Sequence, residues 1–185
     1  QPPERKPVAL NCVLEAAVEL MGYGLRTADI TLTLDLDPEL PELSADADQL
    51  AQVFTNLMAN AQQALLEVAP PRRLAIATRW TRTPGTAHIT FTDNGPGIPE
   101  AVRSRIFEPF YTSKPVGVGT GIGLSFSYGV IVAHGGRIAL ESPPTGGAHF
   151  IITLPLAPPA PAPAGQPPPI PPHAPSRPTP LGEDQ

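Results

Sequence analysis

Asn56, Asn60 and Asp93 are the polar residues whose types and spacing are best suited to chemistry. The two asparagines are four residues apart in a run with helical periodicity, so both amides point from one helix face, beside its apolar stripe. Solvated amides on helices are common, and that interpretation alone would explain the pair. Asn is nevertheless a poor choice for an exposed helix, and a neutral amide oxygen is a reasonable ligand for a hydrated Mg²⁺ ion that keeps substrate phosphates as its other partners.

Asp93 opens the stretch DNGPGIP, residues 93–99, at the end of a run with strand-like alternation. Asn, Gly and Pro are the usual residues of surface turns, so a plain turn is one interpretation. A turn that holds Gly95 and Gly97 also presents a flat wall without side chains. At such a wall the carboxylate of Asp93 would accept a hydrogen bond from the amino group of a ligand.

Residues 107–123, FEPFYTSKPVGVGTGIG, show neither the helix period nor the strand period. A segment of this kind inside a compact domain favours a functional loop or lid. Phe107 and Phe110 are its apolar anchors, and Lys114 is a mobile cation.

The stretch GTGIGLS, residues 119–125, places three glycines ahead of a predicted helix. Backbone amides at a glycine-rich helix start bind phosphate, because their donors are unpaired and the helix dipole is favourable. Two familiar nucleotide motifs are excluded. The P-loop pattern fails because Lys114 precedes its glycines. The Rossmann pattern fails because no βαβ unit follows and Leu124 stands where a glycine is expected.

Apolar periodicity along the rest of the chain predicts the elements that position these clusters. The expected helices span residues 11–21, 44–68, 100–106 and 124–135, and the expected strands span residues 30–36, 73–80, 87–93, 137–142 and 148–155. Asn11 is expected to cap the first helix, and the glycines after Met21 are expected to end it. Ser44, Asp46 or Asp48 would cap the second. This order fits an α+β fold with helices on one face of a mixed, mostly antiparallel sheet.

Composition limits the class of protein and its partners. The chain has 185 residues, a formal net charge of −5 and only 12 Lys and Arg, which argues against a nucleic-acid partner held through its phosphates. Cys12 is the single cysteine, which excludes an intrachain disulfide and fits a reducing compartment. On an amphipathic helix it is interpreted as a buried structural thiol. No apolar run approaches the ~20 residues of a membrane span, so we expect no direct membrane contact by this domain and a cytoplasmic location.

We divide the chain into a linker from an upstream region at residues 1–7, one folded domain at residues 8–155 and a Pro-rich disordered tail at residues 156–185. Nearly half of the 27 prolines follow Leu154, where no apolar periodicity supports a core. Because the chain begins at Gln1 without an initiator Met, we expect a piece of a larger or processed protein. A membrane anchor elsewhere in that protein stays open.

Four stretches together, NLMANA, DNGPGIP, FEPFYTSK and GTGIGLS, resemble in order and spacing the N, G1, F and G2 boxes of sensor histidine kinases of two-component systems. The lid is most similar to the nitrogen-regulation type. The resemblance covers residues 8–155 and implies the two-layer α/β sandwich of the GHKL (Bergerat) ATP-binding fold. It also implies binding of ATP and Mg²⁺, and transfer of the γ-phosphoryl group to a His for relay to a response regulator.

The resemblance implies roles for individual residues by their positions in these motifs. Asn60 resembles the magnesium ligand, with Asn56 as a nearby polar contact. Asp93 resembles the acid that reads adenine, with Gly95 and Gly97 as the wall of the base pocket. Lys114 would approach the terminal phosphates. The implied catalytic residues are Asn56, Asn60 and Lys114, and the implied nucleotide-binding residues are Asp93, Gly95, Gly97, Ile98, Phe107, Thr120, Gly121, Gly123 and Leu124.

Two departures from the family bear on the reaction. Related GHKL ATPases such as gyrase and Hsp90 carry a Glu at the position of Asn56, and a neutral amide is no useful base near pH 7. This difference favours transfer over hydrolysis, with a GHKL ATPase or serine kinase and a non-catalytic nucleotide-sensing module as the alternatives.

Many relatives also carry Thr or Ser near Ala148, where a hydroxyl helps a water bridge adenine to the acid. Ala148 cannot do this, and Thr153 is a substitute that we do not favour.

None of the four histidines fits a phosphoacceptor. His88 and His149 lie in strand patterns, and His173 lies in the proline-rich tail. His134 lies at a helix C-terminus, where a cation is favoured. The acceptor His is therefore expected on a dimerisation domain before Gln1, and this chain would be the catalytic domain alone.

Overall fold

The computed structural model describes residues 1–108 and 123–156. Predictions for Phe110, Lys114, Thr120 and Gly121 and for the proline-rich tail lie outside these residues. The elements of the described residues are β1 (Lys6–Val8), α1 (Leu10–Thr27), β2 (Ile30–Asp35), β3 (Leu43–Ala45), α2 (Ala47–Leu65), β4 (Arg72–Thr81), β5 (Thr86–Asp93), α3 (Glu100–Arg103), α4 (Gly123–Ala133), β6 (Arg137–Glu141) and β7 (Ala148–Pro155).

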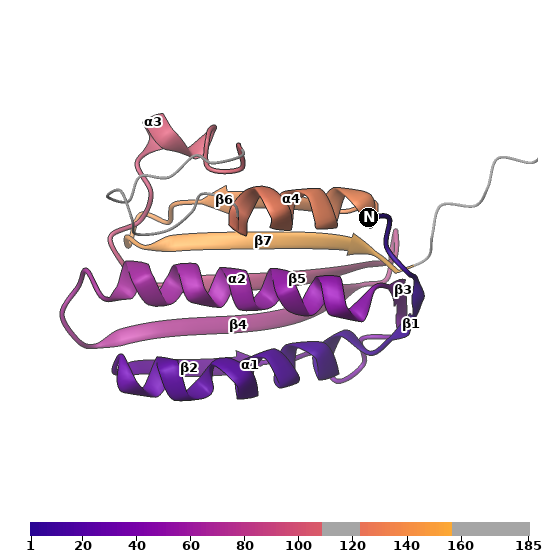
Figure 1. Cartoon of the computed structure of the whole chain (residues 1–185), viewed down its shortest axis with the longest axis horizontal. Coiled ribbons are helices and arrows are strands. Elements are labelled where there is room, and N and C mark those ends of the chain that lie inside the picture. Colours follow the sequence, from indigo (N-terminus) through magenta and orange to yellow (C-terminus); the bar gives the residue numbers. More distant parts are fainter. Residues whose placement is uncertain (109–122, 157–185) are drawn as a thin grey trace, which may run out of the picture.

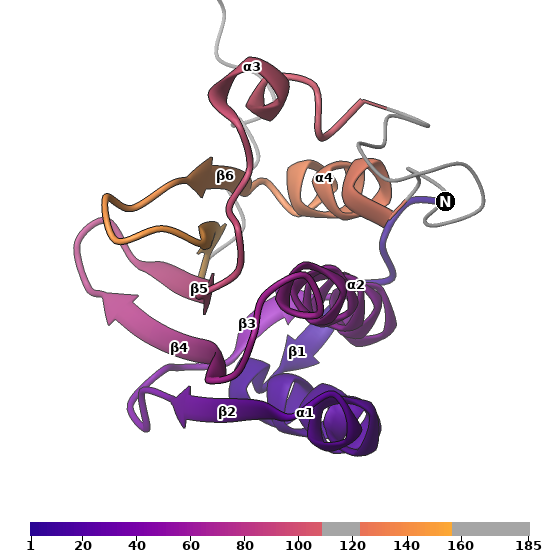
Figure 2. The same cartoon turned by 90° about the vertical axis from the view of Figure 1, so that its left-hand side faces the viewer.

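The five longer strands form one mixed sheet in the order β2-β4-β5-β7-β6. β2 pairs in parallel with β4, and the other neighbouring strands are antiparallel. Figures 1 and 2 show α1, α2 and α4 side by side on one face of this sheet. The chain therefore has the predicted α+β fold, a two-layer α/β sandwich.

The central helix α2 buries the apolar stripe that its sequence predicts. The buried stripe residues are Leu50, Val53, Phe54, Leu57, Met58, Ala61 and Leu65. The ring of Phe54 packs against Phe91 of β5, with the ring centroids 6.0 Å apart. Of the three predicted caps, Asp46 is the one used, and its Oδ1 accepts a hydrogen bond from the amide of Gln49 at 3.1 Å. These contacts fix α2 over the centre of the sheet.

The first helix is longer than predicted, because two glycines lie inside it. α1 continues through Gly22 and Gly24, where the sequence prediction ended it. A glycine costs a helix interior roughly 1 kcal/mol, and burial of Leu14 and Leu25 in the core outweighs this cost. Gly24 also lies where α1 approaches α2, since a Cβ there would lie 3.5 Å from the side-chain amide of Gln62.

Asn11 and Cys12 also differ from their predictions. α1 begins at Leu10, so Asn11 lies inside the first turn and is not its cap. Its Nδ2 donates to the carbonyl of Asp37 at 2.8 Å, and its Oδ1 accepts from the hydroxyl of Thr78 at 2.9 Å. Cys12 is exposed and not buried, because it lies two residues, about 200°, around the helix from buried Leu10.

Two short strands were not predicted. β1 pairs antiparallel with β3, and the register aligns Lys6 with Ala45 and Val8 with Leu43. Lys6 and Pro7 were assigned from sequence to the linker, and both lie in β1. Strands of three residues are too short to show a period, which is why the pattern missed them.

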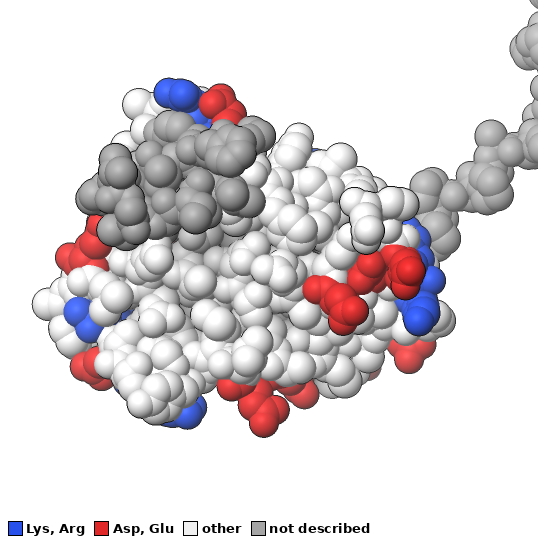
Figure 3. All heavy atoms as spheres, viewed as in Figure 1, with Lys and Arg blue, Asp and Glu red and all other residues white. Residues whose placement is uncertain are grey.

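Charged side chains lie mainly around the rim of the face that Figure 3 shows, and few lie on the helix layer between. Asp48 is the single charged residue of α2, so Asn56 and Asn60 share their helix with no carboxylate beyond its first turn. Across the stretches that the structure covers, no helix is both long and apolar enough to span a bilayer.

Candidate functional site

Asp93 lies at the last position of β5, directly opposite Ala148 of β7. The residue is only 7% exposed. Its Oδ1 accepts hydrogen bonds from the amide of Gly95 at 2.9 Å and from the amide of Ala148 at 3.4 Å. No donor within residues 1–108 and 123–156 contacts Oδ2. Among the described residues, the backbone therefore fixes one carboxylate oxygen of Asp93 and leaves the other without a donor.

Burial raises the pKa of Asp93 above the ordinary value of an aspartate. The hydrogen bonds from Gly95 and Ala148 stabilise the charged form and offset part of this rise. A buried carboxylate gains more from one further donor than an exposed one does, because it has lost its water. This environment suits an acid that recognises a ligand amino group.

Three glycines pack around Asp93 and form a wall without side chains. Gly95 is buried, and a Cβ on it would lie 3.0 Å from Oδ1 of Asp93 and 3.4 Å from Ala64 of α2. Gly97 has a φ of +78°, and a Cβ on it would lie 2.9 Å from the carbonyl oxygen of Gly147. Gly147 has a φ of +83°, and a Cβ on it would overlap the carbonyl oxygen of Asp93. Gly97 and Gly147 therefore need glycine for close approach of backbone to backbone, and Gly95 needs it for close approach to the carboxylate of Asp93.

Sequence reasoning did not identify Gly147. The signal was the pair Gly146–Gly147 directly before the last strand, which marks a turn but gives no indication that this turn packs against DNGPGIP. The sheet order explains the contact, because β5 and β7 are neighbours and the end of one lies beside the start of the other.

The polar face of α2 connects this wall to the start of α4. Asn56, Asn60 and Ala64 follow one another at four-residue spacing and so lie along one stripe of the helix. Ala64 contacts Gly95 at one end of the stripe. Asn56 donates from Nδ2 to the carbonyl of Gly123 at 3.4 Å at the other end. Asn60 is half-buried and lies between these two contacts.

Three further predicted residues belong to the described part of the chain. Ile98, Phe107 and Leu124 are half-buried and pack against the core. The ring of Phe107 lies 5.6 Å from that of Tyr128 in α4, with an angle of 30° between the rings. The carbonyl of Ile98 accepts from Nε of Arg103 at 3.1 Å. The segment after DNGPGIP is thus held against α4.

The strand register shows whether Thr153 can supply the hydroxyl that Ala148 lacks. Ala148 lies opposite Asp93, whereas Thr153 lies opposite His88, five residues further along the same strand. Thr153 contacts His88, with 3.4 Å between its hydroxyl and Nδ1 of the ring. Since a strand rises about 3.3 Å per residue, Thr153 is too far from the acid to replace the missing hydroxyl.

The histidines of the described residues have structural partners. His134 is 2% exposed; its Nδ1 lies 2.8 Å from the carbonyl of Val130, and its Nε2 accepts from the amide of Asp46 at 3.0 Å. Both ring nitrogens of His134 therefore have partners within the fold, which agrees with the structural interpretation of this residue. Nδ1 of His149 lies 2.6 Å from the hydroxyl of Thr92.

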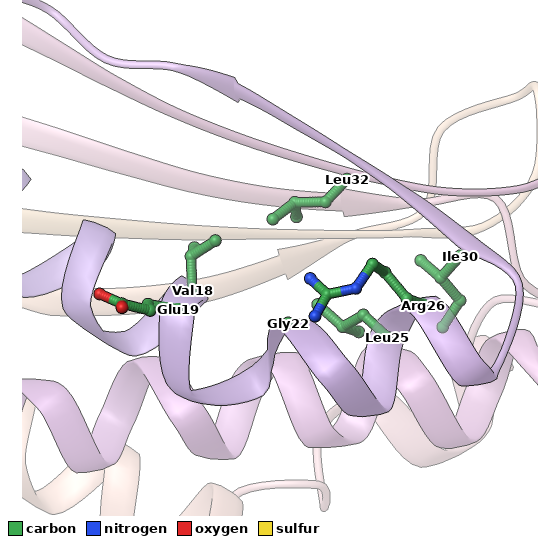
Figure 4. A pocket seen from close by; sticks show the side chains of 7 residues that line it. All are labelled: Val18, Glu19, Gly22, Leu25, Arg26, Ile30 and Leu32. Atoms are coloured by element: carbon green, nitrogen blue, oxygen red, sulfur yellow. The ribbon is translucent and has the colours of Figure 1, made fainter.

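A separate hollow lies between α1 and the edge strand β2 (Figure 4). It is lined by Val18, Glu19, Gly22, Leu25, Arg26, Ile30 and Leu32. None of these residues belongs to the site around Asp93. A Cβ on Gly22 would lie 3.0 Å from the guanidinium of Arg26, which covers part of the hollow.

The fold and this site define a class of protein. Residues 45–158 match the family described as histidine kinase-, DNA gyrase B- and HSP90-like ATPases, and the chain belongs to this family. The matched range contains α2, the turn after β5 and α4, and α2 contacts both of the others, through Ala64 and through Asn56.

Within this family, the relatives are sensor histidine kinases. The chain is 40% identical over 166 residues to the sensory histidine kinase/phosphatase NtrB of Rhodobacter capsulatus, a match that covers 85% of this chain and 46% of the relative. It is 35% identical over 154 residues to the sensor protein FixL of Bradyrhizobium diazoefficiens, covering 83% of this chain and 30% of the relative. The chain thus spans less than half the length of either protein.

Solved structures agree with this assignment. The catalytic domain of histidine kinase ThkA superposes with a TM-score of 0.73 at 30% sequence identity, over 83% of this chain and 97% of that domain. A structure of ThkA in complex with response regulator protein TrrA superposes with a TM-score of 0.70 at 26% identity, over 83% of this chain and 42% of that one. The chain is therefore a homologue of histidine kinase catalytic domains.

Proposed function

We propose that the chain binds ATP between α2 and the turn after β5 and transfers its γ-phosphoryl group to a His on a dimerisation domain of the same protein. The observation that carries this proposal is the carboxylate of Asp93, whose Oδ1 is fixed by two backbone amides while Oδ2 has no donor among residues 1–108 and 123–156. It lies beside a wall of glycines where a flat ring can rest on bare backbone.

In this proposal each end of the nucleotide meets a different element. Oδ2 of Asp93 accepts a hydrogen bond from the adenine amino group, and Gly95 and Gly97 support the ring. Ile98 and Phe107 supply apolar contacts beside it. Amides at the start of α4, at Gly123 and Leu124, bind phosphate together with Thr120 and Gly121, because helix-start amides have no partner within the helix.

The polar stripe of α2 serves the phosphates in the same proposal. Asn60 would hold a Mg²⁺ ion through its amide oxygen, with Asn56 beside it, and the bound ion would neutralise phosphate charge. An amide suits this task, because magnesium takes oxygen ligands and keeps substrate phosphates as its other partners. Lys114 would approach the terminal phosphates as a point charge.

The reaction needs positioning and charge neutralisation more than covalent chemistry. The bond between the γ-phosphorus and the β–γ bridging oxygen breaks, a bond to an imidazole nitrogen of the acceptor forms, and ADP leaves. Hydrolysis would need a base near the phosphates, and within the described part of α2 the single carboxylate is Asp48 in its first turn. This favours transfer over the hydrolysis of a GHKL-type ATPase, with a serine kinase as the remaining transfer reaction.

A non-catalytic nucleotide sensor is the second candidate, and the observation that favours it is the packing of Phe107 on Tyr128. A ligand that shifted this contact would change the surface around α4 without any transfer. In either case we propose a cytoplasmic location and, by analogy with the ThkA complex, a response regulator as the indirect partner.

Incubation with γ-labelled ATP and a purified acceptor-helix domain separates these candidates. Acid-labile label on the acceptor supports the proposed kinase. Free phosphate released by the chain alone would instead indicate an ATPase, and acid-stable label would indicate a serine kinase. Binding of ATP without any product would indicate the sensor.

A further inference from the structure

Asn94 separates Asp93 from Gly95, and its side chain binds the backbone of Pro71 and Arg73, at the start of β4. Its Oδ1 accepts from the amide of Arg73 at 2.6 Å, and its Nδ2 donates to the carbonyl of Pro71 at 2.8 Å. Its backbone amide donates to the carbonyl of Arg73 at 3.3 Å. The side chain is exposed, yet both halves of the amide are used. These contacts have no part in the roles proposed above.

The contacts with Arg73 show how β5 ends. The register pairs Leu74 with Asp93, so Arg73 and Asn94 would be the next pair of the antiparallel ladder. Antiparallel pairs alternate between hydrogen-bonded and non-hydrogen-bonded, and in a hydrogen-bonded pair of a continued ladder each residue donates its amide to the carbonyl of the other. Asn94 donates to Arg73 in this way, but the amide of Arg73 donates to the side chain of Asn94. The side chain thus takes the place of a backbone carbonyl.

This substitution frees the chain to leave the sheet after Asn94. The next amide, that of Gly95, turns back and donates to Oδ1 of Asp93 at 2.9 Å. Because this bond fixes Oδ1 of Asp93, it also defines the position of Oδ2. We propose that Asn94 is a positioning residue of the base pocket, whose side chain ends the β4–β5 ladder and so holds the amide of Gly95 against the carboxylate of Asp93.

The strand start that Asn94 binds is itself attached to the helix layer. Arg72 donates from Nε to the carbonyl of Val68 at 2.9 Å and from a terminal nitrogen to the carbonyl of Ala28 at 2.7 Å, three residues after the end of α2 and one residue after the end of α1. The turn that carries Asp93 and the helix that carries Asn60 are therefore both tied to residues 71–73. Asn94 therefore helps to fix the position of Asp93 relative to α2.

The residue type follows from this double contact. Arg73 needs an acceptor and Pro71 needs a donor, and among side chains of this length only Asn supplies both. Asp keeps the acceptor but places a second oxygen against the carbonyl of Pro71. Ala keeps neither contact. The variants Asn94→Asp and Asn94→Ala therefore separate the bond that ends the ladder from the bond that only adds stability.

Asn11→Ala is the matched control. Asn11 also donates to one backbone carbonyl and accepts one hydrogen bond, but it lies in the first turn of α1 and contacts Asp37 and Thr78. Its loss removes the same two kinds of contact without touching the turn at Asp93. Both alanine variants are expected to lower the melting temperature of the 185-residue chain, so stability alone does not distinguish them.

Amide hydrogen exchange of Gly95 in the nucleotide-free chain tests the inference directly. In Asn94→Ala we expect this amide to exchange about tenfold faster, the effect of losing one ordinary hydrogen bond. In Asn94→Asp and Asn11→Ala its exchange should stay within a factor of two of wild type. Unchanged protection of Gly95 in Asn94→Ala would overturn the proposal, whatever the chain binds.

Selectivity for ATP over GTP is the second readout, and it rests on the proposed function. We expect the ratio of the two affinities to fall about tenfold in Asn94→Ala, to recover largely in Asn94→Asp, and to stay at the wild-type value in Asn11→Ala. A lower melting temperature with wild-type selectivity in Asn94→Ala would reduce Asn94 to a structural residue. If Asp93→Asn also left selectivity unchanged, the assignment of the base pocket would be at fault, and the exchange of Gly95 would still decide the role of Asn94.

Discussion

Gly147 lies against the backbone of Asp93 so closely that a Cβ on Gly147 would overlap the carbonyl oxygen of Asp93. The two residues come from neighbouring strands of the sheet, β7 and β5, and meet where β5 ends and β7 is about to begin. The acid is therefore set by backbone contacts on several sides: Gly95, Ala148 and Gly147. Substitutions around Asp93 are expected to act through this packing.

Gly147→Ala should lower the free energy of unfolding by about 2–4 kcal/mol, because it combines a left-handed φ of +83° with a steric overlap. Gly146→Ala is the matched control, since Gly146 has a similar φ of +89° but nothing within 4 Å of the added Cβ. It should cost about 1 kcal/mol from the backbone conformation alone. Urea unfolding of both variants checks this, and equal costs would contradict the contact with Asp93.

The pH dependence of ATP affinity follows from the raised pKa of Asp93, which is caused chiefly by burial. The proposed hydrogen bond needs the carboxylate, so protonation removes the acceptor. ATP affinity should therefore weaken as the pH falls, starting at a higher pH than an ordinary aspartate would dictate. Titrations of ATP across the acid range measure this. Asp35→Asn, at an exposed position in β2, should leave the profile unchanged, and a flat profile in the wild type would contradict the assignment.

The raised pKa of Asp93 also affects how the stability of the folded chain depends on pH. The folded-state pKa of Asp93 is raised above its unfolded value, so the folded chain binds this proton more tightly. The favourable contribution of the protonated carboxyl is present below the unfolded value of 3.8 and is lost as the pH rises through the folded pKa. Asp93→Asn should consequently gain stability relative to wild type as the pH rises toward neutrality. Thermal unfolding at a series of pH values tests this, and a parallel pair of curves would count against it.

Asn60→Asp should change the dependence on magnesium more than the choice of base, because it replaces a neutral ligand oxygen by a charged one. We expect the magnesium concentration for half-maximal ATP binding to shift several-fold, with the preference for ATP over GTP unchanged within about twofold. Gln52→Glu is the control, an exposed residue of α2 that receives the same type of charge change. An equal shift in both variants would indicate a general electrostatic effect and not a ligand.

Sequence patterns predicted the parts of the fold that repeat with a period. The apolar stripe of α2 and the alternation of β5 and β7 were read correctly, because each buries every third or fourth residue or every second one. The same reasoning failed where tertiary contacts override local preference. Gly22 and Gly24 lie inside α1, and the three-residue strands β1 and β3 depend on pairing with each other.

The candidate site was likewise predicted only in part, because some of its contacts depend on tertiary structure. Asn56 and Asp93 were predicted because their residue types stand out in their elements, and the structure brings the helix and the turn that carry them together through Ala64 and Gly95. Gly147 and Asn94 were not assigned, because their contacts depend on which strands are neighbours. Nothing in the local sequence encodes that order.

The central claim is that Asp93 reads the adenine of ATP, and calorimetric titration of Asp93→Asn with ATP tests it most directly. The substitution places an amide donor where the adenine amino group needs an acceptor, and it leaves the packing of the turn nearly unchanged in volume. We predict that the affinity for ATP falls by about a hundredfold or more, the cost of losing a hydrogen bond to a buried charge and leaving donors unpaired. Unchanged affinity for ATP in a folded Asp93→Asn chain would contradict the account.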